Sequence, residues 1–174
     1  PQGAESHTDT GRAVYSGGGI NPDVVVKPRT IPIERARFQA KLANPVFAFA
    51  MDLVAGKVPG FDAYKVLKPI TYDYDLRKSD FPITEPVFAA FKKYATTKYK
   101  YAPVQIDHER EFVERALRTE LVTAAYGAET ANQVFNDYDD QLQKAIELLP
   151  QAKALAAEGF KANSATSNAK MPSN

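Results

Sequence analysis

A glycine-rich segment near the start of the chain restricts the fold more than any other feature. Gly17, Gly18 and Gly19 lie between two short β-type runs, Ala13–Tyr15 and Val24–Val26, and Pro22-Asp23 marks a turn before the second run. Two such short strands are marginal in water by themselves, so they need a partner sheet. The later sequence has no pattern that offers one. We therefore expect this segment to be the closing edge of another domain.

Composition limits the class of protein. The 174 residues include 44% hydrophobic residues, enough for the core of one domain. The net charge is +1, which argues against a strongly basic surface for nucleic acid or for an acidic membrane face. No apolar run approaches the roughly 20 residues of a membrane span. The absence of Cys excludes disulfides, thiolate catalysis and cysteine metal sites.

The chain changes from β-type to α-type sequence at a connector, Lys27–Pro32. Its two prolines prevent a helix and favour extended backbone. We expect three parts: a glycine-rich β segment (1–30), a helical domain (31–160) and a disordered tail (161–174). The tail is rich in Ser, Asn, Ala and Lys and has no apolar periodicity.

The first half of the helical domain predicts three helices and one extended piece. A short amphipathic helix over 33–43 ends at Asn44-Pro45, where Asn44 caps a second, almost wholly apolar helix over 46–55. Strict alternation over Ile70–Leu76 indicates a short strand or an extended arm. Thr84 is the predicted cap of a third helix that runs to about Thr97. The side chains that this third helix should bury are Val87, Phe88, Phe91 and Tyr94.

The second half predicts two long helices joined at Gly127, a natural helix C-cap. The first begins at an Asp107 cap, with Glu111–Arg115 and Glu114–Arg118 as ion pairs on its solvent side. The second starts at Ala128, with a break near Asp137–Asp140, a kink at Pro150 and an end near Phe160. The predicted buried stripe of the first is Phe112, Val113, Ala116, Leu117, Leu121 and Ala124. The expected fold is mainly α, a helical bundle with a long antiparallel helix hairpin, preceded by a short β-hairpin remnant.

Four short stretches of the glycine-rich segment resemble the end of the protease domain in C-terminal processing peptidases. They are Thr10-Gly11-Arg12, Val14-Tyr15, Gly17-Gly18-Gly19-Ile20 and Pro22-Asp23-Val24. These tail-specific serine peptidases use a Ser–Lys dyad, and some carry a helical C-terminal extension. The stretches Thr119–Gly127 and Asp139–Leu149 look like that extension.

The resemblance transfers no catalytic residue to this chain. In the family, the Ser and Lys motifs precede the segment seen here, and neither occurs in these 174 residues. The resemblance implies a non-catalytic C-terminal portion of a periplasmic or secreted enzyme that cleaves peptide bonds near substrate C-termini. Its implied partner is the peptidase domain of the same polypeptide, with self-association and peptide or protein substrates as further partners. The alternative is a free-standing helical module that binds proteins or peptides.

The candidate chemistry of the residues themselves is weak, and we assign no catalytic, cofactor or metal residue. Ser6-His7 lies in a polar start expected to be mobile, where no base is held against a nucleophile. His108 follows a predicted helix cap and is expected to be solvated. The Gly17–Gly19 loop is followed by a β-type run rather than the helix that a phosphate site needs.

Two further clusters are better explained by structure than by ligands. The aspartates lack the central Gly and terminal Glu of a calcium loop, so capping and solvation explain them better. They are Asp73, Asp75, Asp80, Asp137, Asp139 and Asp140. A stretch of interleaved tyrosines and lysines has the residue types that stack single-stranded nucleic acid, but packing at a helix end fits the neutral charge better. Its members are Lys92, Lys93, Tyr94, Lys98, Tyr99, Lys100 and Tyr101.

Overall fold

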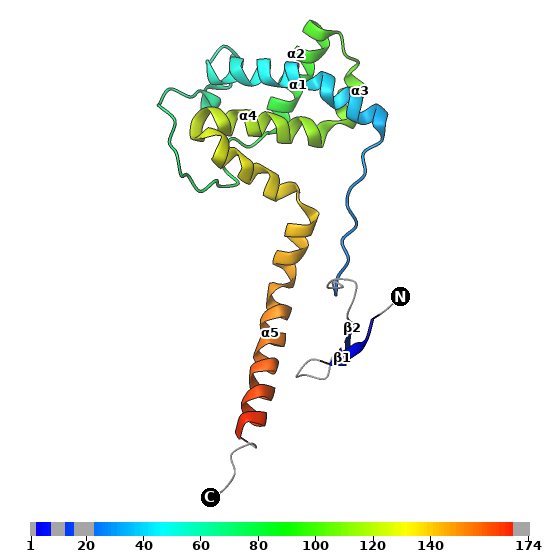
Figure 1. The fold of residues 1–174 in the computed structure, drawn as a ribbon. Coiled ribbons are helices and arrows are strands. Elements are labelled where there is room, and N and C mark those ends of the chain that lie inside the picture. The colour runs from blue at the N-terminus through cyan, green and yellow to red at the C-terminus, as the bar shows by residue number, and fades with distance from the viewer. Residues whose placement is uncertain (1–2, 8–12, 16–22, 169–174) are drawn as a thin grey trace, which may run out of the picture. The chain divides into compact units, whose positions relative to one another are not determined.

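The computed structural model describes residues 3–7, 13–15 and 23–168 and is mainly helical (Figure 1), as predicted. The chain divides into two compact units. One, the helical unit, is the continuous stretch Arg29–Asp139. The other, the end unit, combines Pro1–Pro28 with Asp140–Asn174. The sequence predicts a helical domain over 31–160, but the helical unit ends earlier, at Asp139. The last helix belongs instead to the same unit as the N-terminal segment.

The helical unit is built on α1 (Ile33–Val54) and α4 (Arg110–Ala131), which pack along each other (Figure 1). Helix α2 (Glu85–Tyr99) packs against both, and α3 (Pro103–His108) joins α2 to α4. Two 3₁₀ helices, η1 (Asp62–Tyr64) and η2 (Asn132–Tyr138), complete the unit. The largest fully buried side chains include Leu42, Val46, Phe49, Leu53, Val87, Phe88, Phe91, Ile106, Val113, Leu117 and Leu121.

Helix α1 is continuous through Pro45, so the predicted interruption at Asn44-Pro45 is wrong. A proline inside a helix has no N–H to donate, which leaves the carbonyl four residues earlier without its usual partner. That carbonyl belongs to Lys41, and the Tyr101 hydroxyl donates a hydrogen bond to it at 3.3 Å. Leu42, Val46 and Phe49 are buried on the same side of the helix. The packing of this apolar face keeps the helix intact across the proline.

Helix α4 begins at Arg110 rather than at an Asp107 cap, so the predicted start is wrong. Asp107 lies in α3, where its carboxylate pairs with Lys92 at 2.8 Å. At the other end, Gly127 breaks the regular helix with φ 88° and ψ 165°. A short helical piece and η2 follow it instead of the long second helix predicted from Ala128. The antiparallel hairpin of two long helices stays a prediction.

We expect Gly127→Ala to lower the free energy of unfolding by about 1.5 kcal/mol, because its backbone region is accessible essentially only to glycine. An added Cβ would also lie 3.3 Å from the Tyr72 ring. Urea unfolding followed by circular dichroism measures the loss. Gly60→Ala is the matched control, since it also has positive φ but no atom near its Cβ. Equal losses in the two variants would show that the contact with Tyr72 does not contribute.

The end unit contains a two-stranded ladder that differs from the predicted one. Strand β1 (Glu5–His7) pairs antiparallel with β2 (Ala13–Tyr15), placing Glu5 opposite Tyr15. Val24–Val26 is not a strand, so the prediction for that run is wrong. Glu5–His7, expected to be polar and mobile, is instead a strand. The three valines instead line a groove of about 550 Å³ together with the last helix. The glycine loop between the predicted strands lies outside the described residues.

The last helix, α5, spans Asp140–Asn168 and follows Asp139, which has extended backbone. The predicted break near Asp137–Asp140 is therefore confirmed. Pro150 lies inside this helix, and the predicted end near Phe160 is wrong because the helix continues to Asn168. Of the expected 161–174 tail, residues 169–174 lie outside the described residues.

Candidate functional site

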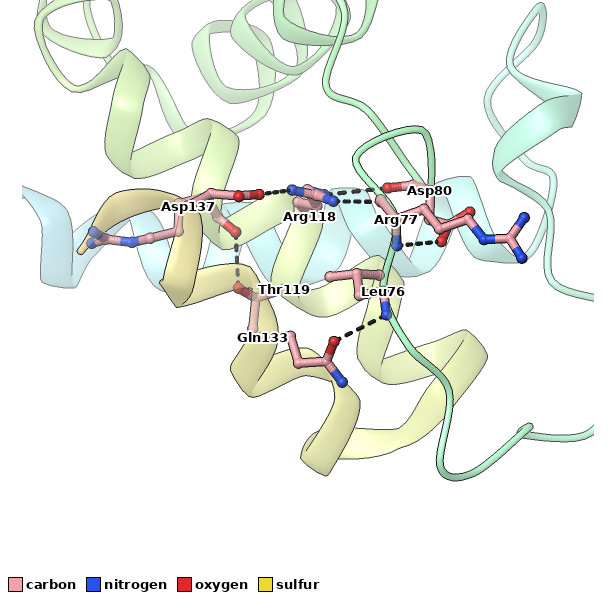
Figure 2. A network of polar contacts seen from close by, with 8 residues as sticks. Leu76, Arg77, Asp80, Arg118, Thr119, Gln133 and Asp137 are labelled. Carbon is pink, nitrogen blue, oxygen red and sulfur yellow. Dashed lines mark hydrogen bonds and ion pairs between the residues drawn. The ribbon is translucent and has the colours of Figure 1, made fainter. Parts of the chain in front are cut away.

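The densest polar network of the helical unit centres on Arg118 of α4, which is 8% exposed. Its guanidinium donates three hydrogen bonds (Figure 2). One goes to the Asp80 carbonyl at 3.2 Å and one to the Arg77 carbonyl at 2.9 Å. The third goes to the Asp137 carboxylate of η2 at 2.8 Å. Arg118 thus joins α4, η2 and the 77–80 turn, and we call these contacts the arginine clamp.

The chain on either side of the 77–80 turn is held by further polar contacts. Gln133 of η2 accepts a hydrogen bond from the Leu76 amide at 3.0 Å and donates one to the Tyr74 carbonyl at 3.1 Å. The Asp80 carboxylate accepts a bond from the Arg77 amide at 2.8 Å. The turn and the extended piece before it are therefore fixed by side chains far away in the sequence. Of the predicted strand or arm over Ile70–Leu76, the arm is what forms.

The residue after the turn, Phe81, has φ 48°, a left-handed conformation that bulky side chains rarely adopt. Such strain persists only where the surroundings enforce it. Here the clamp fixes Asp80 on one side, and the Tyr64 hydroxyl donates to the Pro82 carbonyl on the other. The Phe81 ring meets the Tyr126 ring edge-on at 6.1 Å. The clamp therefore holds an unfavourable backbone geometry in place.

A stacked pair of tyrosines closes the network. The Tyr74 and Tyr126 rings lie 4.0 Å apart and almost parallel. Burial raises the pKa of the Tyr74 hydroxyl, and Asp80 and Tyr126 add to this shift. Chemically, the Arg118 guanidinium is already occupied by two carbonyls and a carboxylate. The arrangement therefore suits positioning of the chain rather than binding of an anion.

The clamp was not predicted, because Arg118 was assigned to a solvent-side pair with Glu114. Both predicted pairs are wrong: Glu114 pairs with Arg110, and Glu111 pairs with Arg29. Arg115 instead lies against the rings of three aromatic residues, Phe112, Phe135 and Tyr138. A sequence signal did exist, since Leu117, Leu121 and Val122 surround position 118 on one side of the helix. Of the predicted stripe, Val113, Leu117 and Leu121 are fully buried.

A second charged cluster lies where α1 meets the start of α4. The Glu109 carboxylate is 2% exposed and accepts two bonds from Arg35, at 2.6 and 3.0 Å, and one from Gln39 at 2.6 Å. The hydrogen bonds from Arg35 lower the pKa of Glu109, burial opposes this shift, and Gln39 reinforces it. The cluster borders an open pocket of about 260 Å³ that Phe38 and Val104 also line. Sequence reasoning missed this cluster as well.

The two histidines lie apart from both clusters. His7 is in β1, exposed, with its ring 3.4 Å from the Glu5 carboxylate. Ser6, its neighbour, is paired with Val14 in the ladder. His108 ends α3 with an exposed side chain, and its carbonyl accepts a bond from Arg35.

The aspartates singled out in the sequence do not converge on one site. Asp80 and Asp137 belong to the arginine clamp, and Asp73 and Asp75 are exposed in the extended piece before it. Asp139 precedes α5 and Asp140 is its first residue. Within the residues that the structure describes, no three metal-ligating side chains form a group.

The tyrosine–lysine stretch forms an aromatic ladder at the end of α2. The Tyr99 and Tyr101 rings stack at 6.1 Å, and Tyr94 lies 6.0 Å from Tyr99. Lys98 lies over the Tyr94 ring and donates to its hydroxyl, while Lys100 donates to the Thr97 carbonyl. The tyrosines are half-buried, and they pack against α1: Tyr94 lies against Phe49 and Tyr101 against Phe38.

Comparisons of the chain with protein-family models, with curated proteins and with solved structures found no match in any of the three. Among the described residues, no helix is both long and apolar enough to cross a membrane.

Proposed function

We propose that this chain is the non-catalytic C-terminal portion of a C-terminal processing serine peptidase, with an architectural or regulatory role. The parent enzyme would hydrolyse peptide bonds near substrate C-termini with a Ser and a Lys that precede this chain. The proposal rests first on the likeness of the glycine-rich segment to the end of that peptidase domain. Periplasmic or secreted location belongs to the same proposal.

The structural observation that supports the proposal is the ladder of β1 and β2. Each strand has three residues, and every side chain described in it is exposed. Such a ladder buries too little apolar surface to be stable in water by itself. An edge of a larger sheet is the setting in which these strands gain stability, and the peptidase domain is the proposed source of that sheet.

The helical unit supports an architectural rather than a chemical role. Its most buried charged groups, Arg118 and Glu109, are each held by several partners within the unit. Removing a partner from such a buried charge is destabilising, so these contacts support a defined shape of the unit. The unit is suited to gating peptide access, binding substrate or supporting the peptidase fold.

The decisive experiment compares this chain with the longer polypeptide encoded by the same reading frame. We expect the longer polypeptide to cleave a peptide near its C-terminus, to lose this activity when its upstream Ser is replaced by Ala, and the 174-residue chain to be inactive. The free-standing helical module predicts no peptidase activity in either. An upstream sequence without Ser and Lys motifs would contradict the proposal.

A substitution in the ladder tests the proposed sheet directly. In the longer polypeptide, we expect Tyr15→Asp to lower the melting temperature, because Tyr15 then packs into the sheet. In this chain alone Tyr15 is 42% exposed, and the same change should have little effect. Ile31→Asp in the connector, 49% exposed, is the matched control and should be neutral in both. Equal effects of Tyr15→Asp in the two polypeptides would count against a shared sheet.

A further inference from the structure

Helix α1 has a second apolar face besides the one that it buries in the core. The helix extends across the helical unit (Figure 1) and has 22 residues. At the rise of an α-helix this is a length of about 33 Å. Seven apolar residues outside the fully buried set follow one another at steps of three and four positions, which places them on one face. We call them the α1 stripe: Ile33, Ala36, Ala40, Ala43, Phe47, Met51 and Val54.

Much of the α1 stripe is exposed. Ile33 is 65% exposed and Phe47 53%, the three alanines are exposed, and Met51 and Val54 are half-buried. A single exposed apolar side chain is common on protein surfaces, but a row of them along a whole helix is typical of a face with a partner. The stripe contains no charged residue, and Arg37 beside it is paired with Glu34 of the same helix at 3.0 Å. The surface that covers the stripe should therefore be apolar and uncharged.

The order of large and small residues along the α1 stripe fits a second copy of the same stripe. Suppose that two α1 helices pack antiparallel about a two-fold axis between Ala43 and Asn44, so that positions equally far on either side of the axis face each other. Phe47 then lies opposite Ala40 of the second copy, and Met51 lies opposite its Ala36. Large side chains of each helix thus fill the space above small ones of the other. A parallel pair in register would instead place Phe47 against Phe47 and alanine against alanine.

The residue beside this axis is suited to pairing with its own copy. Asn44 is exposed, and its side-chain amide both donates and accepts hydrogen bonds. The two Asn44 side chains can therefore bond to each other across the axis. A single polar residue in an apolar contact between helices fixes the register of the pair. The net charge of the chain, +1, opposes association of two copies little.

We propose that the α1 stripe is a homodimer interface in which two copies of this chain pack antiparallel across Ala43 and Asn44. The proposal does not depend on a peptidase parent, because it concerns the 174-residue chain by itself. Seven side chains from each copy form a small interface compared with those of permanent dimers. We therefore expect a dimer that dissociates in the micromolar range.

Sedimentation equilibrium of the 174-residue chain over a range of concentrations measures the association. The mean mass should rise from that of one chain towards that of two. Phe47→Asp should raise the dissociation constant about thirtyfold, because it places a charge at an aromatic anchor of the contact. Phe135→Asp in η2 is the matched control, since Phe135 is 48% exposed, and it should dimerise as the unaltered chain does. Circular dichroism of both variants should match that of the unaltered chain.

Cross-linking tests the antiparallel register, since the chain has no Cys of its own. Ala43→Cys should form disulfide-linked dimers under mild oxidation, because the two thiols lie beside the axis. Ala36→Cys, on the same stripe, should not, because its two copies lie about 22 Å apart along the helices at 1.5 Å a residue. Mixing Ala36→Cys with Met51→Cys should give a cross-linked pair, because these positions face each other.

Three results would overturn the proposal. The first is a chain that stays monomeric at every concentration, which would favour an upstream domain as the occupant of the stripe. The second is an equal weakening of the dimer by Phe47→Asp and Phe135→Asp, which would remove the link to α1. The third is equal cross-linking of Ala43→Cys and Ala36→Cys, which would indicate a parallel pair or random collision.

Discussion

Arg118→Met should lower the free energy of unfolding of the helical unit by about 3 kcal/mol. Methionine fills the space of the aliphatic stem, so the change isolates the loss of the guanidinium. The carbonyls of Arg77 and Asp80 lose their donor, and Asp137 loses its cation. The Asp137 side chain is 35% exposed and regains water, which keeps the loss at the lower end for a buried ion pair. Urea unfolding followed by circular dichroism measures it.

Amide hydrogen exchange distinguishes local opening of the arginine clamp from a loss of global stability of the helical unit. In Arg118→Met, the amides of Arg77 and Asp80, both bonded within the turn, should exchange faster even where global unfolding is negligible. Arg118→Lys keeps the charge but offers a single donor group. Its free energy of unfolding and its amide exchange rates should lie between those of the unaltered chain and those of Arg118→Met. Arg37→Met, at a pair whose side chains are both well exposed, should change stability by no more than about 0.5 kcal/mol. A loss in Arg118→Met as small as in Arg37→Met would refute the role of the clamp.

Acid should destabilise the helical unit through Glu109. Because Arg35 lowers the pKa of Glu109 in the folded state, the unfolded chain binds a proton there more readily. The stabilisation is fully present above the unfolded pKa of about 4.3 and is lost as pH falls through the lower folded pKa. Glu109→Gln should cost about 2 kcal/mol at pH 7, since charge-assisted hydrogen bonds become neutral ones. Its stability should then fall less steeply below pH 4.3 than that of the unaltered chain.

Urea titrations at a series of pH values from neutral to acidic measure the difference between the two proteins. Glu34→Gln is the matched control, because Glu34 pairs with Arg37 in an exposed i,i+3 pair on the same helix as Arg35. It should change both the stability and its pH dependence little. Parallel pH profiles for Glu109→Gln and the unaltered chain would show that Glu109 is not the group responsible.

The helices were predictable where an apolar stripe and a cap coincide. Thr84 and the Val87–Phe91 stripe correctly marked the start and the buried face of α2. The apolar run 46–55 contributes Val46, Phe49, Ala50 and Leu53 to the core, whereas Phe47 of the same run is 53% exposed. The break predicted at Pro45 does not occur, because tertiary packing offsets the lost helical hydrogen bond. The hydroxyl of Tyr101, which lies in a connection between later helices, also donates to the carbonyl that Pro45 leaves without a donor. Sequence periodicity contains no information about a partner so far away.

The partners of Arg118 could not be predicted from the sequence for a related reason. Helical spacing suggests that Arg118 pairs with Glu114. A long arginine side chain can also turn inward and donate to buried carbonyls. Those carbonyls exist only once the 77–80 turn has folded against α4. Similarly, β1 lacks the β-branched residues that mark strands, and pairing with β2 alone identifies it.

The division of the chain into two units has a consequence for its synthesis on the ribosome. All of Arg29–Asp139 is contiguous, so the helical unit can fold as soon as this stretch has emerged. The end unit combines Pro1–Pro28 with Asp140–Asn174 and is complete only after α5 has been made. At about 5–20 residues per second, this delay is a few seconds. During that time Val24–Val26 lack the helix with which they form a groove, so a chaperone or an upstream domain has an interval in which to bind them.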